Sequence, residues 1–309
     1  MRAGVAAEKS GDFQAAVQNF RNALSIQPNL LVAHVHLAAA YYKANDLFHA
    51  RMEAEQLHTA NPADLPTALL LANTYIKMGR EAQAAELLAG LEAGHETDME
   101  LEYSLAFAQI QSGRDAEGLP RMEKVARAMT SANAWFIAGA GRFQQSEFVD
   151  AKADLDAALK LNASLPGLQS MAGQVDYALG DGEAANPHFQ AALRADPRDF
   201  NANLYTGMYL VKQGDFESAR PLLELAVQLQ PASPLARLKL AELNGITGNY
   251  TEAVGALEGL EKAAPDWPEP HIHLAALYYK LHRPEDGQRE RAIVEQILAR
   301  QQMARPANK

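Results

Sequence analysis

The 309-residue sequence contains no cysteine, and this absence removes a set of possible functions. Without thiols the chain cannot form disulfides, thiolate nucleophiles, iron–sulfur clusters or cysteine zinc sites. It does not fix a compartment, because a cysteine-free protein tolerates either redox environment. The cytoplasm is the default location, and the periplasm is the alternative if an upstream signal has been removed.

Basic residues and long apolar runs are also scarce. The 28 Lys and Arg are outnumbered by 38 Asp and Glu, which gives a net charge of -10. Nucleic acid is therefore not the expected partner, because a phosphate backbone binds to basic faces. No segment reaches the roughly 18 apolar residues of a membrane span, since even the stretch from Leu30 to Tyr42 is interrupted by His34 and His36. With 59 alanines against 15 prolines, the composition favours an all-α fold.

A repeat of 34 residues runs along the chain, with one spacing of 33. Its turn residue recurs at Gly11, Asn45, Gly79, Gly113, Ser146, Gly180, Gly214, Gly248 and His282. Seven residues before each turn stands a small residue: Gly4, Ala38, Ala72, Ala106, Gly139, Gly173, Gly207, Ala241 or Ala275. Five residues after it stands another: Ala16, Ala50, Ala84, Gly118, Ala151, Ala185, Ala219, Ala253 or Gly287. A period of this length indicates stacked supersecondary units.

Each unit is predicted to be a hairpin of two helices that approach closely at the two small residues. The second helix carries an apolar column at Phe20, Leu88, Met122, Leu155, Phe189, Leu223 and Leu257. Proline ends that helix in five repeats, at Pro28, Pro62, Pro197, Pro231 and Pro265. Pro120, Pro187 and Pro221 share one position about seven residues past the turn. Because the first turn of a helix tolerates proline, we expect the second helix to begin just before that position.

This pattern resembles the tetratricopeptide repeat family, in a bacterial-type solenoid protein. The resemblance implies a right-handed superhelical solenoid of about nine 34-residue hairpins, in which residues 1–302 form a single continuous domain and 303–309 a polar tail. Repeats are expected to start near residues 1 (partial), 31, 65, 99, 132, 166, 200, 234 and 268. Where the family often has tryptophan, this chain has Trp135 in one repeat and elsewhere His34, Ala68, Glu102, Gln169, Asn203, Arg237 and His271. Since Met1 falls inside the first helix of the first repeat, the chain is interpreted as a fragment or as lacking upstream repeats.

No motif of the sequence supports catalysis or a metal site. His34 and His36, like His271 and His273, are two residues apart, so on a helix their side chains point about 200° apart and cannot share one metal ion. The 34-residue spacing leaves no room for a nonrepeating insert of about 15 or more residues that would host an active site. We therefore expect no catalytic residue, no metal ligand and no cofactor, and a small-molecule ligand is disfavoured.

The resemblance places the binding surface on the concave face, formed by first-helix residues three, six and ten places before each turn. That face is apolar and aromatic here, with some neighbouring polar anchors. The predicted partner-binding residues are Val35, Tyr42, Leu69, Asn73, Ile76, Tyr103, Phe107, Phe136, Phe143, Gln144, Gln174, Tyr177, Met208 and Lys212.

Two functions follow from this groove. The first is a nonenzymatic scaffold that binds a protein or peptide segment in the apolar, aromatic groove. The alternative is an accessory or regulatory portion of a longer bacterial protein of export, envelope-assembly or polysaccharide machinery.

Overall fold

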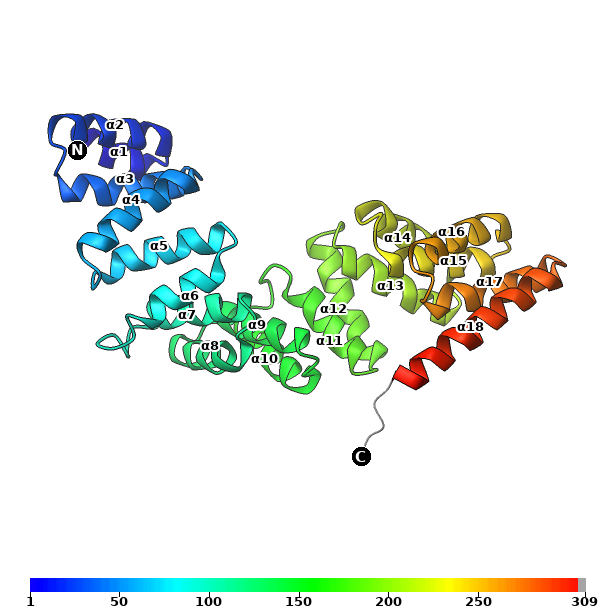
Figure 1. The fold of residues 1–309 in the computed structure, drawn as a ribbon. Helices are drawn as coiled ribbons and strands as arrows, with labels where there is room; N and C mark the ends of the chain where they lie inside the picture. The colour runs from blue at the N-terminus through cyan, green and yellow to red at the C-terminus, as the bar shows by residue number, and fades with distance from the viewer. Residues whose placement is uncertain (305–309) are drawn as a thin grey trace. The chain divides into compact units, whose positions relative to one another are not determined.

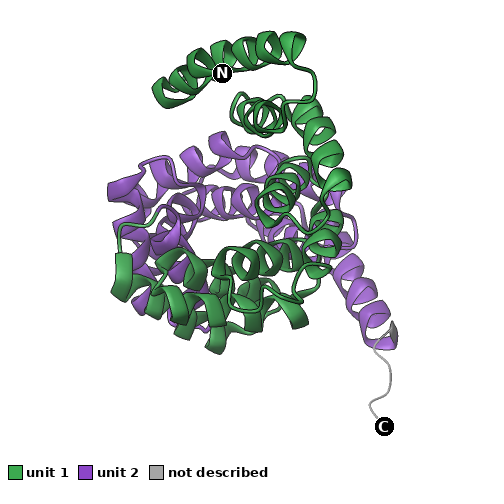
Figure 2. Ribbon diagram, turned by 90° about the vertical axis from the view of Figure 1, so that its left-hand side faces the viewer, with its two compact units in different colours: residues 1–165 green, residues 166–309 purple. Residues whose placement is uncertain are grey.

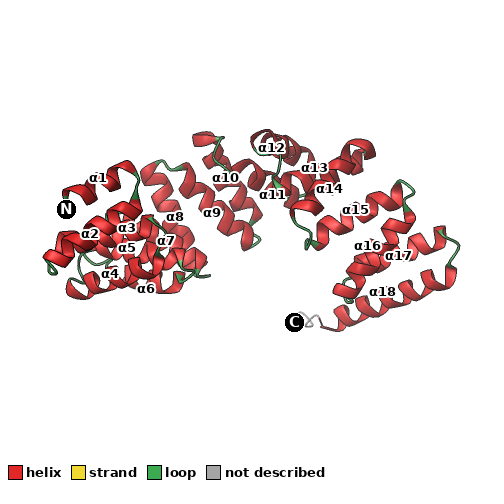
Figure 3. Cartoon of the chain, turned by 90° about the horizontal axis from the view of Figure 1, so that it is seen from above, coloured by secondary structure: helices red, strands yellow, loops and turns green. Residues whose placement is uncertain are grey.

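The protein is described by a computed structural model, in which residues 1–304 are placed well enough to be described. Within that range the chain forms eighteen helices and no strand, joined by short loops (Figures 1 and 3). The helices are α1 Arg2–Ser10, α2 Phe13–Ile26, α3 Leu31–Lys43, α4 Leu47–Ala60, α5 Leu65–Lys77, α6 Glu81–Ala89, α7 Met99–Gln111, α8 Asp115–Met129, α9 Ala132–Gln144, α10 Phe148–Asn162, α11 Leu168–Ala178, α12 Gly182–Ala195, α13 Phe200–Gln213, α14 Phe216–Leu229, α15 Pro234–Ile246, α16 Tyr250–Ala263, α17 Pro268–Lys280 and α18 Pro284–Ala304. The all-α prediction is confirmed, whereas the handedness of the superhelix stays a prediction.

Every predicted turn residue separates an odd-numbered helix from the next even-numbered one. All nine have a positive backbone φ, between 58° and 89°. Glycine adopts this left-handed conformation without the steric cost that a Cβ brings, and asparagine tolerates it better than most other residues. Ser146 and His282 adopt it as well, so in those two repeats the hairpin geometry overrides the local preference.

The two small-residue columns pack between the helices of each hairpin, as predicted. All eighteen residues of the two columns are buried. Four of the glycines face the apolar column of the second helix directly. A Cβ added to Gly4 would lie 2.5 Å from the Phe20 ring, and one added to Gly173 would lie 2.7 Å from the Phe189 ring. Small residues in the first helix therefore make room for large ones in the second.

The predicted start of the second helices is wrong. Helices α8, α12 and α14 begin five residues before Pro120, Pro187 and Pro221, which lie inside them. In α12 and α14 the residue after the turn is an aspartate whose carboxylate accepts a hydrogen bond from the third backbone N–H of the helix, and so begins the helix early. Each proline removes only one backbone bond, and all three prolines are exposed, so water can reach the freed carbonyl group.

Contacts divide the chain into two compact units, Met1–Leu165 and Pro166–Lys309 (Figure 2). Helices α3, α5, α7, α9, α13, α15 and α17 begin at the residues given above for the repeat starts, and α11 begins at Leu168. Helix α18 extends through Ala304, so most of the predicted polar tail lies outside the described residues. No helix of the described part is both long enough and apolar enough to cross a membrane.

Candidate functional site

All fourteen predicted groove residues lie on odd-numbered helices, from α3 to α13. Their exposure differs. Val35, Gln144, Tyr177 and Lys212 are exposed, whereas Tyr42, Asn73, Ile76, Tyr103, Phe107, Phe136, Phe143, Gln174 and Met208 are half-buried. Leu69 is buried at 7% exposure and packs with Ala72 and Leu88 in a core cluster, so its side chain is not available to a partner.

In the first unit several of these residues already have partners within the chain. The Lys77 ammonium lies 4.1 Å from the centroid of the Tyr42 ring. The Tyr103 hydroxyl accepts a hydrogen bond from the Asn133 amide at 2.7 Å. The Phe143 ring packs against Phe148 with centroids 5.6 Å apart. These contacts hold the side chains in place while each predicted aromatic keeps part of its surface exposed.

The second unit contains a cavity of about 880 Å³ that brings together three of the predicted residues, Tyr177, Met208 and Lys212. It is lined by Tyr177, Leu179, Gly180, Asp181, Gly182, Glu183, Ala185, Asn186, Phe189, Tyr205, Met208, Tyr209, Val211, Lys212, Gln213, Leu223, Lys239 and Glu242. Helices α11, α12, α13, α14 and α15 all contribute to this wall, together with the α11–α12 turn. A volume of this size is typical of a ligand-binding cleft.

Three rings in contact form one wall of the cavity. The centroids of Tyr177 and Tyr205 are 4.7 Å apart, and Phe189 stacks on Tyr205 at 5.1 Å with only 5° between the ring planes. Burial, and secondarily the neighbouring Tyr177, raises the pKa of Tyr205, so its hydroxyl stays protonated at neutral pH. This stack provides a rigid apolar surface that is 40% exposed at Tyr177.

The polar groups of the cavity are unequally satisfied. Lys239 donates to Glu242 at 2.9 Å, and His273 lies 3.0 Å from the same carboxylate. Burial opposes ionisation of Glu242, but the hydrogen bonds from His273 and Lys239 outweigh it and lower its pKa. In contrast, the side-chain oxygen Oδ1 of Asn186 is buried and has no hydrogen-bond partner within the described chain. A buried acceptor without a partner costs the folded chain free energy.

Sequence reasoning missed Tyr205, Asn186 and Lys239 in this cavity. The groove rule samples only three positions of each first helix. Asn186 lies on a second helix, α12, and Tyr205 and Lys239 lie on first helices at other positions. The run Gly180-Asp181-Gly182 forms the turn between α11 and α12 and also lines the cavity. It was the one signal in the sequence that pointed to this turn.

The two histidines of each His-x-His pair contact different carboxylates. His34 Nδ1 lies 2.8 Å from Glu53, whereas His36 lies 2.9 Å from Glu8. In the last hairpin His271 pairs with Glu290, and His273 with Glu242. The two imidazoles of each pair therefore have different partners.

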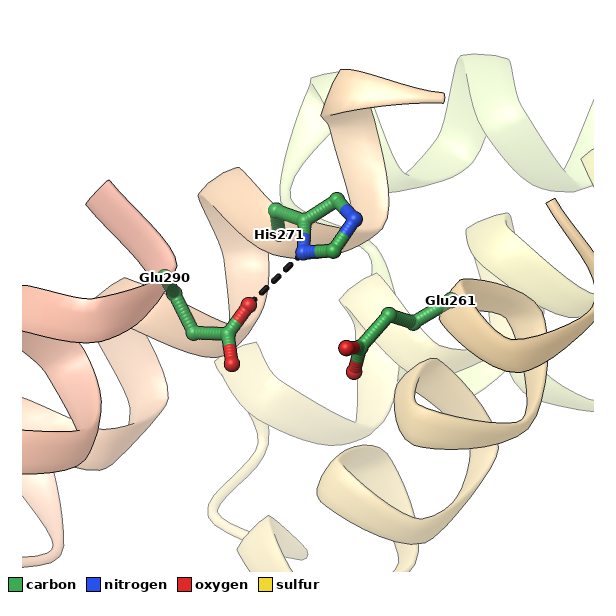
Figure 4. A group of neighbouring side chains, drawn as sticks. All are labelled: Glu261, His271 and Glu290. Carbon is green, nitrogen blue, oxygen red and sulfur yellow. Dashed lines mark hydrogen bonds and ion pairs between the residues drawn. The ribbon is translucent and has the colours of Figure 1, made fainter. Parts of the chain in front are cut away.

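A polar cluster surrounds His271 in this hairpin. Glu261, His271 and Glu290 each place one ligand atom within 4.8 Å of the other two (Figure 4). Burial, together with the Glu290 carboxylate, raises the pKa of Glu261.

These features define a class of protein, an all-helical protein of repeated hairpins with a cavity in its second unit. Sequence comparisons identify the repeat. Residues 1–30, 170–234 and 210–269 match profiles described as tetratricopeptide repeat. These segments of the chain are tetratricopeptide repeats.

Known proteins share part of this chain. It is 34% identical over 96 residues to the Superkiller complex protein 3 of Homo sapiens, a match that covers 31% of this chain and 6% of that protein. The chain thus spans a small part of this relative.

Solved structures share the fold at low sequence identity. The Cut9–Hcn1 hetero-tetramer of the APC/C matches with a TM-score of 0.61 and 15% identity, over 89% of this chain and 54% of the other. Pseudomonas aeruginosa pilF matches with a TM-score of 0.61 and 17% identity, over 74% and 99%. These likenesses support the fold alone.

Proposed function

We propose that this chain is a nonenzymatic scaffold whose cavity over residues 177–242 receives an extended or helical segment of a partner protein. Tetratricopeptide repeats are typical of protein–protein interaction scaffolds, and the net charge of -10 favours a protein over a nucleic acid as partner. The observation that carries the proposal is the cavity itself, which joins an aromatic wall, exposed at Tyr177, to the half-buried amide of Asn186.

The recognition mechanism follows from these two features. The exposed part of Tyr177 and the side chain of Met208 contact an apolar side chain of the segment. The half-buried Asn186 lines the same cavity and supplies a side-chain amide for a polar contact with the segment. Lys212, exposed at the rim, favours a segment with an acidic residue next to the apolar one.

The first unit is proposed to supply further contacts through the exposed parts of the other predicted groove residues. Val35 and Gln144 are exposed there, and Asn73, Phe136 and Phe143 are half-buried. Leu69 is left out of the proposed surface because it is buried. Contacts of this kind add specificity around the few buried anchors that dominate an interface.

The test compares two tyrosines at the same repeat position. Tyr177 and Tyr279 both precede their turn residue by three and are 40% and 39% exposed, but only Tyr177 lines the large cavity. A pull-down from a native extract followed by peptide mapping gives a candidate segment, whose affinity is then measured by fluorescence anisotropy. Tyr177→Ala is expected to weaken binding by about 2 kcal/mol, roughly thirtyfold, while Tyr279→Ala leaves it unchanged. Equal affinity of both variants and the unaltered chain would refute the assignment of the cavity.

A further inference from the structure

Three helices direct one metal-binding side chain each into the same small volume of the second unit. Glu261 comes from α16, His271 from α17 and Glu290 from α18 (Figure 4). His271 is 1% exposed and Glu290 is 9% exposed, whereas Glu261 is half-buried. The donor set is therefore one imidazole nitrogen and two carboxylates, largely shielded from water.

The backbone fixes which nitrogen of His271 faces this volume. Nε2 lies 3.1 Å from the carbonyl oxygen of Pro265. A carbonyl only accepts hydrogen bonds, so Nε2 carries a hydrogen and Nδ1 is directed at Glu290, 2.7 Å away. Histidines that bind metals commonly donate their other ring N–H to a backbone carbonyl in this way, which orients the ring and fixes the tautomer.

A second hairpin of the chain shows the same pair without the third ligand. His34 Nδ1 lies 2.8 Å from Glu53, and its Nε2 lies 2.8 Å from the carbonyl oxygen of Pro28. The repeat position of Glu261, ten residues before the histidine, is occupied there by Leu24. A histidine–carboxylate pair is satisfied by a shared proton. The additional carboxylate of Glu261 is half-buried, and within the described residues no hydrogen bond or ion pair holds it.

We propose that Nδ1 of His271 and the carboxylates of Glu290 and Glu261 bind one divalent transition-metal ion, with zinc as the representative species. Imidazole nitrogen and carboxylate oxygen are common zinc ligands, and three protein ligands leave the fourth position to water. The ion would connect α16, α17 and α18 and so stabilise the last hairpins of the folded chain by mass action.

The first experiment is an isothermal titration of the whole chain with zinc chloride in a buffer that does not chelate metals. We expect one equivalent to bind the unaltered chain. Loss of a residue that supports a metal ligand typically weakens metal affinity by about 10- to 100-fold, and loss of a ligand itself costs no less. Glu261→Gln should therefore weaken the zinc affinity by at least about tenfold. Glu53→Gln, the matched change at the two-ligand pair, should leave zinc binding unchanged. Absence of zinc binding by the unaltered chain, or equal affinity of Glu261→Gln, would overturn the proposal.

A gain-of-function variant tests the role of the third carboxylate. Leu24→Glu places a carboxylate at the matching position of the His34 hairpin, so a folded variant with an unchanged helical circular-dichroism spectrum should bind two equivalents of zinc. A folded Leu24→Glu chain that binds a single equivalent would overturn the claim that this position completes the site. Neither outcome depends on the partner segment, so the scaffold function is tested separately.

Discussion

The α9–α10 and α11–α12 hairpins carry charges of opposite sign at the same two repeat positions. In the first, Arg142 on α9 lies 2.7 Å from Asp154 on α10. Thirty-four residues later Asp176 stands on the first helix and His188 on the second, 3.6 Å apart. The repeat therefore specifies where a polar pair lies between the helices and not which helix carries the acid.

Because the basic residue is an arginine in one hairpin and a histidine in the other, the charge of the two pairs depends differently on pH. Arg142 stays charged at every accessible pH and also contacts Glu123 on α8, so it holds two carboxylates. His188 provides a cation only when it is protonated, and its Nδ1 lies 2.7 Å from the neutral amide oxygen of Gln169. The first hairpin thus depends on one permanent cation, whereas the second pairs its acid with a histidine and adds aromatic packing.

Loss of that permanent cation should have the largest effect on stability. Arg142→Met leaves the buried Asp154 and the half-buried Glu123 without their shared partner, and breaking a buried ion pair on one side costs about 3 to 5 kcal/mol. Urea unfolding followed by circular dichroism at pH 7 measures the change. Arg127 contacts Glu123 from an exposed position, so Arg127→Met should cost under about 1 kcal/mol. Equal destabilisation by the two changes would contradict this account.

The pH dependence of the first hairpin gives a second, slightly smaller effect. Burial raises the pKa of Asp154 from 3.8 to about 6, and Glu123 adds to this shift against the opposing effect of Arg142. The folded chain therefore holds this proton more tightly than the unfolded chain. The resulting stabilisation is complete below about pH 3.8 and is lost as the pH rises through 6, a change of about 3 kcal/mol.

Substitution isolates this contribution from the other carboxylates. The difference in unfolding free energy between the unaltered chain and Asp154→Asn should shift by about 2 kcal/mol between pH 4 and pH 7, in favour of the variant at the higher pH. A difference that is constant across this range would show that Asp154 titrates normally.

The helix pairs were predictable because their determinants are local and repeated. A left-handed turn residue and two small residues recur every 34 positions, and the close approach of two helices allows little else at those places. The early start of α12 and α14 could have been predicted too, since Asp181 and Asp215 directly follow the turn and act as caps. The proline rule failed because an exposed proline in the second turn costs only one hydrogen bond.

The cavity and the polar pairs were harder to predict, for a different reason. The cavity and the polar pairs each depend on side chains from several helices. Which of these side chains meet is decided by how the hairpins pack on one another. The spacing of 19 residues between His34 and Glu53 also separates Gln169 from His188 and His271 from Glu290, so the pairs left a signal in the sequence. The convergence of Tyr177, Tyr205 and Phe189 left no such period.

The smallest expected change in stability comes from the close contact between a glycine of the first helix and a large side chain of the second. In the α11–α12 hairpin that side chain is Phe189, and in the α9–α10 hairpin it is Leu155. A Cβ added at Gly173 would lie 2.7 Å from the Phe189 ring, and one added at Gly139 would lie 2.8 Å from Leu155. Overpacking of this kind costs about 1 to 3 kcal/mol, so both glycine-to-alanine variants should lose similar stability in urea unfolding. Gly255→Ala, where a Cβ meets nothing within 4 Å, should be neutral or stabilising by up to about 1 kcal/mol.

Partner binding should separate the two destabilised variants. Gly173→Ala pushes on Phe189, which stacks on Tyr205 in the cavity wall, whereas Leu155 is not part of that wall. We therefore expect Gly173→Ala to weaken binding of the mapped segment severalfold and Gly139→Ala to leave it unchanged, measured by fluorescence anisotropy under conditions where both variants stay folded. A loss of affinity that tracks stability alike in both hairpins would mean that the aromatic stack serves folding and not recognition.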